Sequence, residues 1–334
     1  MNITWFYADR DGAEWNSSRW RVLWPHRALQ RAGIASRIAS LPQECELPVP
    51  HPLMTWADVV VIERVNGYPP QPPRMRQVQK HVEWALSHKR TFLTIDDAYH
   101  LMPSSSPSKV VWNKHALDTF RDYARSSQGV FCPSLKLSRD AICGSKGIYI
   151  PNYPDLHDVP PPVSQHAPEQ TVIGWGATQQ HTRSFTVVAR ALREVLQRRS
   201  DVQVWMITSP SIFASAKLPS YRSRLLHWRR PYRSYMQFIG NHFTVGLAPL
   251  FGGYDQRRSW IKPLEYALMG IPWVASNTLE YRKVKGGQVV GKHGDWAQAI
   301  LKALESPRGE AVAWARHQGI DEHIKEYMEV LGCD

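Results

Sequence analysis

Short apolar runs alternate along the chain with longer segments in which apolar residues recur every three or four positions. The short runs are typical of buried strands and the longer segments of amphipathic helices. The predicted strands are 2–8, 35–40, 58–64, 91–96, 129–134, 147–152, 171–176, 202–208, 243–250 and 271–276. The predicted helices are 20–33, 75–88, 113–126, 134–143, 183–199, 231–240 and 259–270, with one or two more in 309–331. This alternation predicts an α/β protein with parallel sheets covered on both faces.

The segment 151–170 interrupts the alternation. It contains six prolines and has no helical period, as in a stiff linker. We therefore predict an N-terminal domain over 1–150, the linker over 151–170 and a C-terminal domain over 171–310. A last helical segment, 311–334, has the length to cross back to the first domain. Ligands of open parallel sheets bind beyond the carboxyl ends of the strands, so the cleft between two such domains is the expected site.

Positive charge exceeds negative charge in both halves of the chain. The formal net charge is +12, with 19 bases and 13 acids up to residue 150 and 22 bases and 16 acids after it. Between Asp201 and Glu265 the single acid is Asp255. The nine bases in that window are Lys217, Arg222, Arg224, Arg229, Arg230, Arg233, Arg257, Arg258 and Lys262. A segment in which nearly all charges are positive favours an anionic partner. A basic protein also has such segments without any anionic partner.

The apolar content excludes a membrane-spanning protein and a disordered chain. The hydrophobic fraction is 43%, and no apolar run reaches membrane length. The opening residues become charged at Asp9, too early for a signal peptide. The four cysteines lack metal-ligand spacing and are expected to be reduced thiols. We therefore expect a cytoplasmic protein, in the host cytoplasm if it is viral, with no membrane insertion and no metal centre. The pattern specifies no oligomeric state.

The stretch RRSWIKPLEYALMGIPWVAS, which begins at Arg257, gathers cations at the start of a short apolar helix. Arg258, Ser259 and Lys262 lie at that start, and Glu265 follows one turn later. The amino end of a helix is already positive, so cations there are unfavourable unless an anion approaches. The stretch therefore predicts a phosphate or diphosphate site.

A second segment, TVIGWGATQQHTRSF, has the features of a phosphate-binding turn. Its predicted strand ends in Gly174 and Gly176, and a helix follows Thr178. Glycines let a ligand approach the backbone, and free amides at a helix start can hold a phosphate. Turns of this kind also occur in α/β proteins without any ligand.

Together the two segments resemble the two-domain glycosyltransferases of the GT-B fold, nearest to the retaining family numbered four. The resemblance is carried by IGWGATQQHT, VGLAPL and RSWIKPLEYALMGIPWVAS, and VFCPSLKLSRDA and IPNYPD are similar to that family's domain junction. It covers most of the chain and is specific in the second domain. It implies two Rossmann-like, doubly wound parallel-sheet domains that face a central cleft.

The resemblance also implies roles for particular residues. Glu265 would accept hydrogen bonds from the ribose of a UDP- or GDP-linked sugar, and Lys262 would stabilise the charge of the leaving diphosphate without a metal or other cofactor. The full set implied for the nucleotide-sugar site is Gly176, Thr178, Arg183, Arg258, Ser259, Lys262 and Glu265. Many members carry an acid where this chain has Arg257, so the contact of an acid with the donor sugar is in doubt and the sugar stays unassigned.

The first domain is expected to hold the acceptor. Ser18, Arg19 and Arg21 are candidates for phosphate contacts and Trp20 for stacking. An ordinary capped helix with packed tryptophans explains the same residues. Asp96, Asp97 and His100 lie at the carboxyl end of a predicted strand.

Asp97 or His100 is a candidate to orient or deprotonate an acceptor hydroxyl, although acids at such positions also cap helices. The segment YRSRLLHWRRPYRSY, residues 221–235, suits nucleic acid through phosphate contacts and stacking, and equally suits the donor's base.

The predicted function is transfer of a sugar from a nucleotide-sugar to a hydroxyl acceptor, with retention. Charge on both domains and abundant Trp with Arg favour DNA with hydroxymethylated bases as the acceptor, as in viral DNA-modifying enzymes. The alternative acceptors are a cell-surface polysaccharide and a lipid-linked glycan. Two other function classes are a non-catalytic nucleic-acid-binding protein with this fold and a sugar-nucleotide epimerase.

Overall fold

The computed structural model describes residues 1–9, 12–14, 16–65, 72–104, 106–162, 170–177, 182–228 and 231–333. It divides into two compact units, each with a six-stranded parallel sheet. The predicted α/β class with two doubly wound sheets is therefore confirmed. The N-terminal unit comprises Met1–Asp155, Arg257–Ser259 and Gly319–Asp334, and the C-terminal unit comprises Leu156–Gln256 and Trp260–Gln318. Arg257–Ser259 thus differ from the predicted division, because their contacts lie in the N-terminal unit.

The N-terminal sheet reverses its strand order between β1 and β3. Its strands are β1 (Asn2–Tyr7), β2 (Ala35–Ser40), β3 (Val59–Glu63), β4 (Arg90–Thr94), β5 (Gly129–Cys132) and β6 (Gly147–Tyr149). Their order in the sheet is β2-β1-β3-β4-β5-β6. Trp5 of β1 lies opposite Ile38 of β2 on one side and Val61 of β3 on the other. The reversal between β1 and β3 is the place where a sheet of this kind binds ligands.

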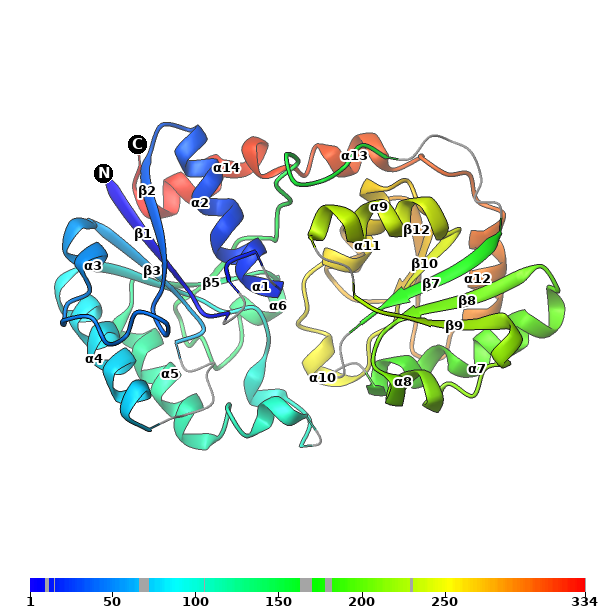
Figure 1. The fold of residues 1–334 in the computed structure, drawn as a ribbon, viewed down its shortest axis with the longest axis horizontal. Helices are drawn as coiled ribbons and strands as arrows, with labels where there is room; N and C mark the ends of the chain where they lie inside the picture. The colour runs from blue at the N-terminus through cyan, green and yellow to red at the C-terminus, as the bar shows by residue number, and fades with distance from the viewer. Residues whose placement is uncertain are drawn as a thin grey trace. The chain divides into compact units, whose positions relative to one another are not determined.

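Helices cover both faces of this sheet. The longer ones are α2 (Trp24–Arg31), α4 (Pro72–His88), α5 (Lys114–Ser126) and α14 (Ile320–Leu331), and the shorter ones are α1 (Asn16–Ser18), α3 (Pro52–Trp56) and α6 (Leu135–Ser138). A π-helical turn, Arg19–Leu23, joins α1 to α2, and two 3-10 turns span Tyr99–Leu101 and Pro107–Lys109. α2 and α14 lie together on one side of the sheet, with α4 and α5 on the other (Figure 1). The ring of Tyr327 in α14 contacts Trp5 at 6.1 Å and Phe131 at 5.9 Å between centroids, so the last helix completes this core.

The C-terminal sheet reverses its order between β7 and β10. Its strands are β7 (Thr171–Gly176), β8 (Val202–Ile207), β9 (Ser223–Leu226), β10 (Val245–Ala248), β11 (Trp273–Ser276) and β12 (Gly287–Val290). They lie in the order β12-β11-β10-β7-β8-β9. Its helices are α7 (Thr182–Arg198), α8 (Pro210–Ser215), α9 (Tyr232–His242), α10 (Gly252–Asp255), α11 (Ile261–Leu268), α12 (Trp296–Leu304) and α13 (Val312–Arg316), with 3-10 turns at Ser220–Arg222 and Tyr281–Lys283.

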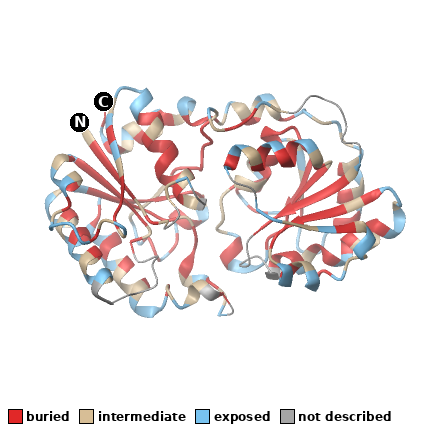
Figure 2. Ribbon diagram, in the orientation of Figure 1, coloured by how far each residue is buried: buried red, intermediate tan, exposed pale blue. Residues whose placement is uncertain are grey.

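The two faces of the C-terminal sheet are packed differently. On one face, α7 and α12 bury a continuous apolar core that includes Leu192 and Ile300. On the other, aromatic rings lie directly over strand glycines. A Cβ on Gly174 would fall 2.0 Å from the ring of Phe243, and one on Gly246 would fall 2.5 Å from the ring of Tyr266. These glycines therefore allow the close approach that positions α9 and α11 over the sheet. Figure 2 shows that the strands of both sheets are largely buried.

Among the described residues, no helix has the combination of length and apolar character that a membrane crossing needs.

Candidate functional site

In the C-terminal unit, α11 carries an ion pair between Lys262 and Glu265. Lys262 Nζ donates hydrogen bonds of 3.0 Å to Glu265 Oε2 and to the hydroxyl oxygen of Tyr235 on α9. The Tyr235 hydroxyl in turn donates to Glu265 Oε2 at 3.3 Å. The Glu265 side chain is 4% exposed and that of Lys262 is 26% exposed. The carboxylate is therefore buried, while the lysine side chain is partly exposed.

Two aromatic rings line the surface beside this pair. Lys262 Nζ lies 5.5 Å from the ring centroid of Trp228 and 5.0 Å from that of Tyr235. A Cβ built on Gly176, the last residue of β7, would lie 3.4 Å from the Tyr235 hydroxyl oxygen and 3.7 Å from the Trp228 ring. Gly176, Trp228, Tyr235 and Lys262 thus converge at the carboxyl end of β7, beside the strand-order reversal. We call Gly176, Trp228, Tyr235, Lys262 and Glu265 the α11 site.

The electrostatics of the α11 site keep its lysine charged. Burial is the largest single influence on the pKa of Lys262 and lowers it, but Glu265 together with Tyr266 and Tyr281 raises the pKa above its usual value. Burial, reinforced by Glu265, raises the pKa of Tyr235 well above its usual range, so the phenol stays protonated. The site therefore offers a partly exposed cation, a buried hydrogen-bond acceptor and an aromatic face, which suit a phosphate, a sugar hydroxyl and a base.

Trp228 and Tyr235 belong to the aromatic-basic segment 221–235, but neither residue was predicted for this site. Their aromatic-basic context favoured contact with a base or phosphate, and the remaining signal lies in tertiary contacts with Lys262. Thr178 lies outside the described residues. Arg183 belongs to α7, but its side chain is also outside the described part of the chain.

The start of α7 is fixed by Asp255, the single acid of the basic window. The Ser184 hydroxyl donates to Asp255 Oδ2 at 2.6 Å, and the Phe251 amide donates to the same oxygen at 3.0 Å. Asp255 is 4% exposed. This acid therefore joins α7 to the loop that follows β10.

Arg257 is bound within the N-terminal unit. Its Nε donates to Asp140 Oδ2, and its carbonyl accepts a 2.6 Å hydrogen bond from the Ser134 hydroxyl. His100 Nε2 lies 2.8 Å from the other oxygen of Asp140. At the position where the resembling family carries an acid, this chain therefore has a cation that neutralises Asp140.

Arg258 and Ser259 also have partners in the N-terminal unit. Arg258 lies 3.4 Å from Asp97 Oδ2, and Asn152 Nδ2 donates to the Ser259 hydroxyl oxygen at 3.0 Å. Asp97 and His100, which were predicted together as candidate bases, thus have different partners, Arg258 and Asp140. Burial is the main cause that lowers the pKa of His100, and Asp140 only partly offsets it.

The structure corrects the predicted acceptor-binding helix. Trp20 is 4% exposed and packs edge-on against Trp24, with 4.3 Å between ring centroids. Arg21 is 1% exposed, and it donates to Thr94 Oγ1 at 3.0 Å and to the Ile150 carbonyl at 2.8 Å. The π-helical turn directs both side chains into the unit, so neither is available to stack on or bind an acceptor.

Ser18 and Arg19, which precede Trp20 in the chain, differ in burial. Ser18 is fully buried and donates its hydroxyl to Glu63 Oε2. Arg19 is half-buried and donates to the carbonyl of Glu14. Of the four predicted residues, only Arg19 retains partial exposure.

Sequence reasoning missed a charged cluster at the reversal between β1 and β3. Glu63 ends β3, is 2% exposed and accepts the Ala8 amide at 2.9 Å through Oε2. Arg64 follows it with φ +42°, in the left-handed region that a side chain other than glycine rarely adopts, and donates to Asp9 Oδ1 at 2.6 Å. Asp96, after β4, accepts the hydroxyl of Tyr99 at 2.6 Å.

Burial is the largest influence on Glu63 and raises its pKa to about 7. Arg64 opposes this shift, while Asp9 and Asp96 add to it. Glu63 appears in the sequence only as the polar end of an apolar strand. Arg64 follows it in the chain, but Asp9 and Asp96 come from the turns after other strands. No sequence pattern therefore indicates this cluster.

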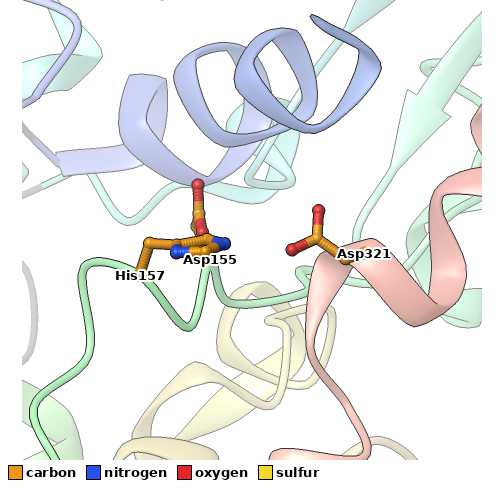
Figure 3. Close-up of side chains that lie close together, drawn as sticks. All are labelled: Asp155, His157 and Asp321. Atoms are coloured by element: carbon orange, nitrogen blue, oxygen red, sulfur yellow. The ribbon is translucent and has the colours of Figure 1, made fainter. Parts of the chain in front are cut away.

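Another charged group joins the segment after β6 to α14. Arg31 NH1 lies 3.0 Å from Asp155 Oδ2, and Arg31 NH2 lies 2.8 Å from Asp321 Oδ1. Figure 3 shows both carboxylates. Since the guanidinium bridges both carboxylates, this group holds the C-terminal helix in the N-terminal unit.

No family model matches the chain, and no curated protein matches its sequence significantly. Solved structures do match its fold. HepE from Anabaena, in complex with UDP and glucose, is 13% identical over 99% of this chain and 99% of its own, with a TM-score of 0.61. AviGT4, a glycosyltransferase involved in avilamycin A biosynthesis, is 14% identical over 99% and 96% of the two chains, with a TM-score of 0.62.

TarM from S. aureus, in complex with UDP, alpha-GlcNAc-glycerol and fondaparinux, is 14% identical with a TM-score of 0.57. The match covers 82% of this chain and 55% of TarM, so the chain spans about half the length of that protein. The similarity to these structures, with the two parallel sheets, establishes the GT-B fold.

Proposed function

We propose that this protein is a glycosyltransferase that moves a sugar from a nucleoside-diphosphate sugar to a hydroxyl acceptor. The observation that carries the proposal is the α11 site at the strand-order reversal of the C-terminal sheet. There a charged Lys262 reaches the surface beside an aromatic face, while the Glu265 carboxylate is buried behind it. The fold is shared with HepE and TarM, whose structures contain UDP, and this supports a uridine nucleotide as the donor.

In this proposal Glu265 accepts hydrogen bonds from the ribose, Lys262 stabilises the departing diphosphate, and the exposed ring of Trp228 stacks on the base. A cation placed where negative charge develops lowers the barrier for departure of the leaving group. No metal and no further cofactor is needed for these roles. Retention of the anomeric configuration is supported by the resemblance of RSWIKPLEYALMGIPWVAS to the retaining enzymes.

For the acceptor we propose hydroxymethylated bases in DNA. The net charge of +12 and the window with a single acid support a polyanionic acceptor. A glycan is the second candidate, supported by glucose in the HepE complex and by the GlcNAc-glycerol in that of TarM. We also propose that the protein acts in the cytoplasm, where its four cysteines, all free in the structure, stay reduced.

The deciding experiment incubates the protein with a panel of UDP- and GDP-sugars and measures release of the nucleoside diphosphate. Each donor is paired with duplex DNA that contains 5-hydroxymethylcytosine, with unmodified duplex DNA, or with a neutral oligosaccharide. Glycosyl transfer adds the mass of one sugar to the acceptor, and NMR of the product gives its anomeric configuration. Conversion of the donor with no acceptor present would instead indicate an epimerase. Binding to DNA without turnover of any donor would indicate a non-catalytic binding protein.

A further inference from the structure

We propose that Asn152 is a positioning residue that directs the hydroxyl hydrogen of Ser259 to the diphosphate of the donor. Asn152 follows β6 in the N-terminal unit, and Ser259 ends the segment Arg257–Ser259, which belongs to the same unit. Helix α11 begins two residues later, at Ile261. The inference rests on the proposed function, in which Lys262 stabilises the departing diphosphate, and it adds a residue that acts on the donor without contacting it.

Arg21 identifies which end of the Asn152 amide faces Ser259. Asn152 is 2% exposed, and its Oδ1 accepts a hydrogen bond of 3.2 Å from Arg21 NH1. A guanidinium group only donates, so the end of the amide that faces Arg21 is the oxygen and the other end is the NH2 group. Asn152 Nδ2 therefore donates to Ser259 Oγ, at 3.0 Å, and the serine oxygen is the acceptor.

This contact leaves the hydroxyl hydrogen of Ser259 without an acceptor. A hydroxyl group carries one hydrogen to donate and two lone pairs that accept. In the described part of the chain, Asn152 is the only hydrogen-bond partner of the Ser259 side chain. Ser259 is only half-buried. Since Asn152 donates to the oxygen, the hydrogen points away from Asn152 and remains to be donated to a ligand.

The usual role of a serine next to a helix start is to cap the helix, and Ser259 does not have this role. The N-cap residue of α11 is Trp260, whose side chain makes no hydrogen bond to the first turn. The amino end of α11 therefore keeps its partial positive charge, and Lys262 adds a full one. A hydroxyl hydrogen, a helix start and a cation all complement an anion, and together they suit the oxygens of a diphosphate.

Asn152 thus controls the polarity of the Ser259 hydroxyl. A hydroxyl rotates about its Cβ–Oγ bond and presents either its hydrogen or a lone pair to a neighbour. A lone pair directed at a phosphate oxygen repels it, whereas the hydrogen forms a charge-assisted hydrogen bond. By occupying a lone pair from the buried side, the Asn152 amide favours the second arrangement.

The test compares ligands that differ only in the diphosphate. UDP and uridine, and likewise GDP and guanosine, are titrated into the full-length protein by calorimetry. Asn152→Asp keeps the size of the side chain and the partner Arg21, but a carboxylate only accepts, so the Ser259 hydrogen turns toward it. An amide that has lost Arg21 can still donate to Ser259, and Arg21 is therefore not varied. Asn113→Asp, which changes an exposed helix cap of α5, is the control.

Two further variants separate the hydrogen bond from the added charge. Ser259→Ala removes the hydroxyl, and Asn152→Ala removes the amide without adding a carboxylate. Each Asn152 variant is also combined with Ser259→Ala. Urea unfolding of every variant confirms that the titrated protein is folded.

We expect Asn152→Asp and Ser259→Ala each to weaken binding of UDP or GDP by about ten-fold or more and to leave binding of the matching nucleoside unchanged. Asn152→Ala should also weaken binding of the diphosphate, but should cause no further loss in a protein that carries Ser259→Ala. Asn113→Asp should bind all four ligands as the wild type does.

Unchanged affinity of both Asn152 variants for the diphosphate overturns the inference. So does a loss in Asn152→Ala that adds in full to that of Ser259→Ala, or an equal loss for nucleoside and diphosphate, because Asn152 would then act on the fold and not through Ser259. Failure of the wild type to bind either UDP or GDP would be a different result. It would overturn the proposed function, and the inference with it.

Discussion

Lys262 and Glu265 are one turn apart on α11, and their charged groups meet at 3.0 Å with the Tyr235 hydroxyl bound to both. The pair is asymmetric, because the Glu265 side chain is buried and the Lys262 side chain is partly exposed. Without a nucleotide, the lysine neutralises the carboxylate that is proposed to hold the ribose. Binding of a diphosphate would draw the flexible lysine toward the phosphates and leave the carboxylate free to accept hydroxyl groups.

Replacing Glu265 with Gln should weaken nucleotide binding while preserving the fold. The amide keeps the shape and one acceptor oxygen but loses the charge that strengthens hydrogen bonds to ribose hydroxyls. We expect affinity for the nucleotide to fall by about ten- to a hundred-fold, as measured by calorimetry. Glu280→Gln is the matched control, since Glu280 is equally buried and pairs with Lys283 at 2.8 Å in the same unit. Equal affinity of wild type and Glu265→Gln would contradict the ribose assignment.

Lys262→Met should act on turnover more than on donor binding. It removes the cation proposed to stabilise the leaving diphosphate, and removal of one such group typically lowers kcat by about 100- to 1,000-fold. Steady-state assays with the best donor provide the measurement, and urea unfolding corrects for the destabilisation caused by an unpaired Glu265. Lys302→Met, at an exposed position of α12, should leave kcat unchanged. Wild-type turnover in Lys262→Met would exclude this role.

Trp228→Ala should reduce nucleotide affinity because the ring is 38% exposed next to Lys262 and is available to a base. Stacking on an aromatic ring contributes about 1–3 kcal/mol per base, so a loss of about ten-fold is expected, with much of it restored in Trp228→Phe. Tyr221→Ala removes a ring that is 82% exposed in the same segment and serves as the control. Equal affinities of the Trp228→Ala and Tyr221→Ala variants for UDP, and equally for GDP, would contradict the stacking role of Trp228.

Arg21→Ala should destabilise the N-terminal unit and leave nucleotide affinity of the folded protein intact. The buried guanidinium satisfies the Thr94 hydroxyl and the Ile150 carbonyl, and it also donates to Asn152 Oδ1 at 3.2 Å. Its removal should lower the free energy of unfolding by about 3 kcal/mol in urea titrations. Arg19→Ala, at a half-buried position, should change it by less than about 0.5 kcal/mol. Similar small effects of both substitutions would show that Arg21 is not the structural residue described here.

The stability of the protein should depend on pH through Glu63. Its pKa is about 7 in the folded protein against 4.5 ordinarily, so the folded protein binds this proton more tightly than the unfolded chain does. The stabilisation that the raised pKa of Glu63 gives the folded protein is therefore fully present below pH 4.5. It is lost as the pH rises to about 7. Relative to Glu63→Gln, the wild type should lose about 3 kcal/mol across this range.

Arg64, Asp9 and Asp96 carry charge beside Glu63, so the comparison uses the difference between the two proteins at each pH. Urea unfolding at several pH values provides this difference. Parallel curves for wild type and Glu63→Gln would mean that Glu63 has an ordinary pKa.

Of the twelve strands in the described residues, ten follow from the local pattern, because buried strands of a parallel sheet are continuous apolar runs. The two that were missed, β9 and β12, are the edge strands of the C-terminal sheet. Each has four residues, SRLL and GQVV, and only pairing with a neighbouring strand makes them extended. The nine-residue α12 was also missed, as were the short helices α1, α3, α8 and α10.

The sequence by itself determined the fold class and the Lys262–Glu265 pair, since one helical turn brings residues three apart together. Only tertiary structure decided which residues surround that pair. Tyr235 is 27 positions before Lys262 and reaches it because the strand glycines bring α9 and α11 close to the sheet. The same holds for Glu63, which meets Ser18 from 45 positions away, and for Arg21, whose burial depends on residues up to 131 positions distant. Contacts over such separations are set by the order of strands in a sheet, which no local pattern encodes.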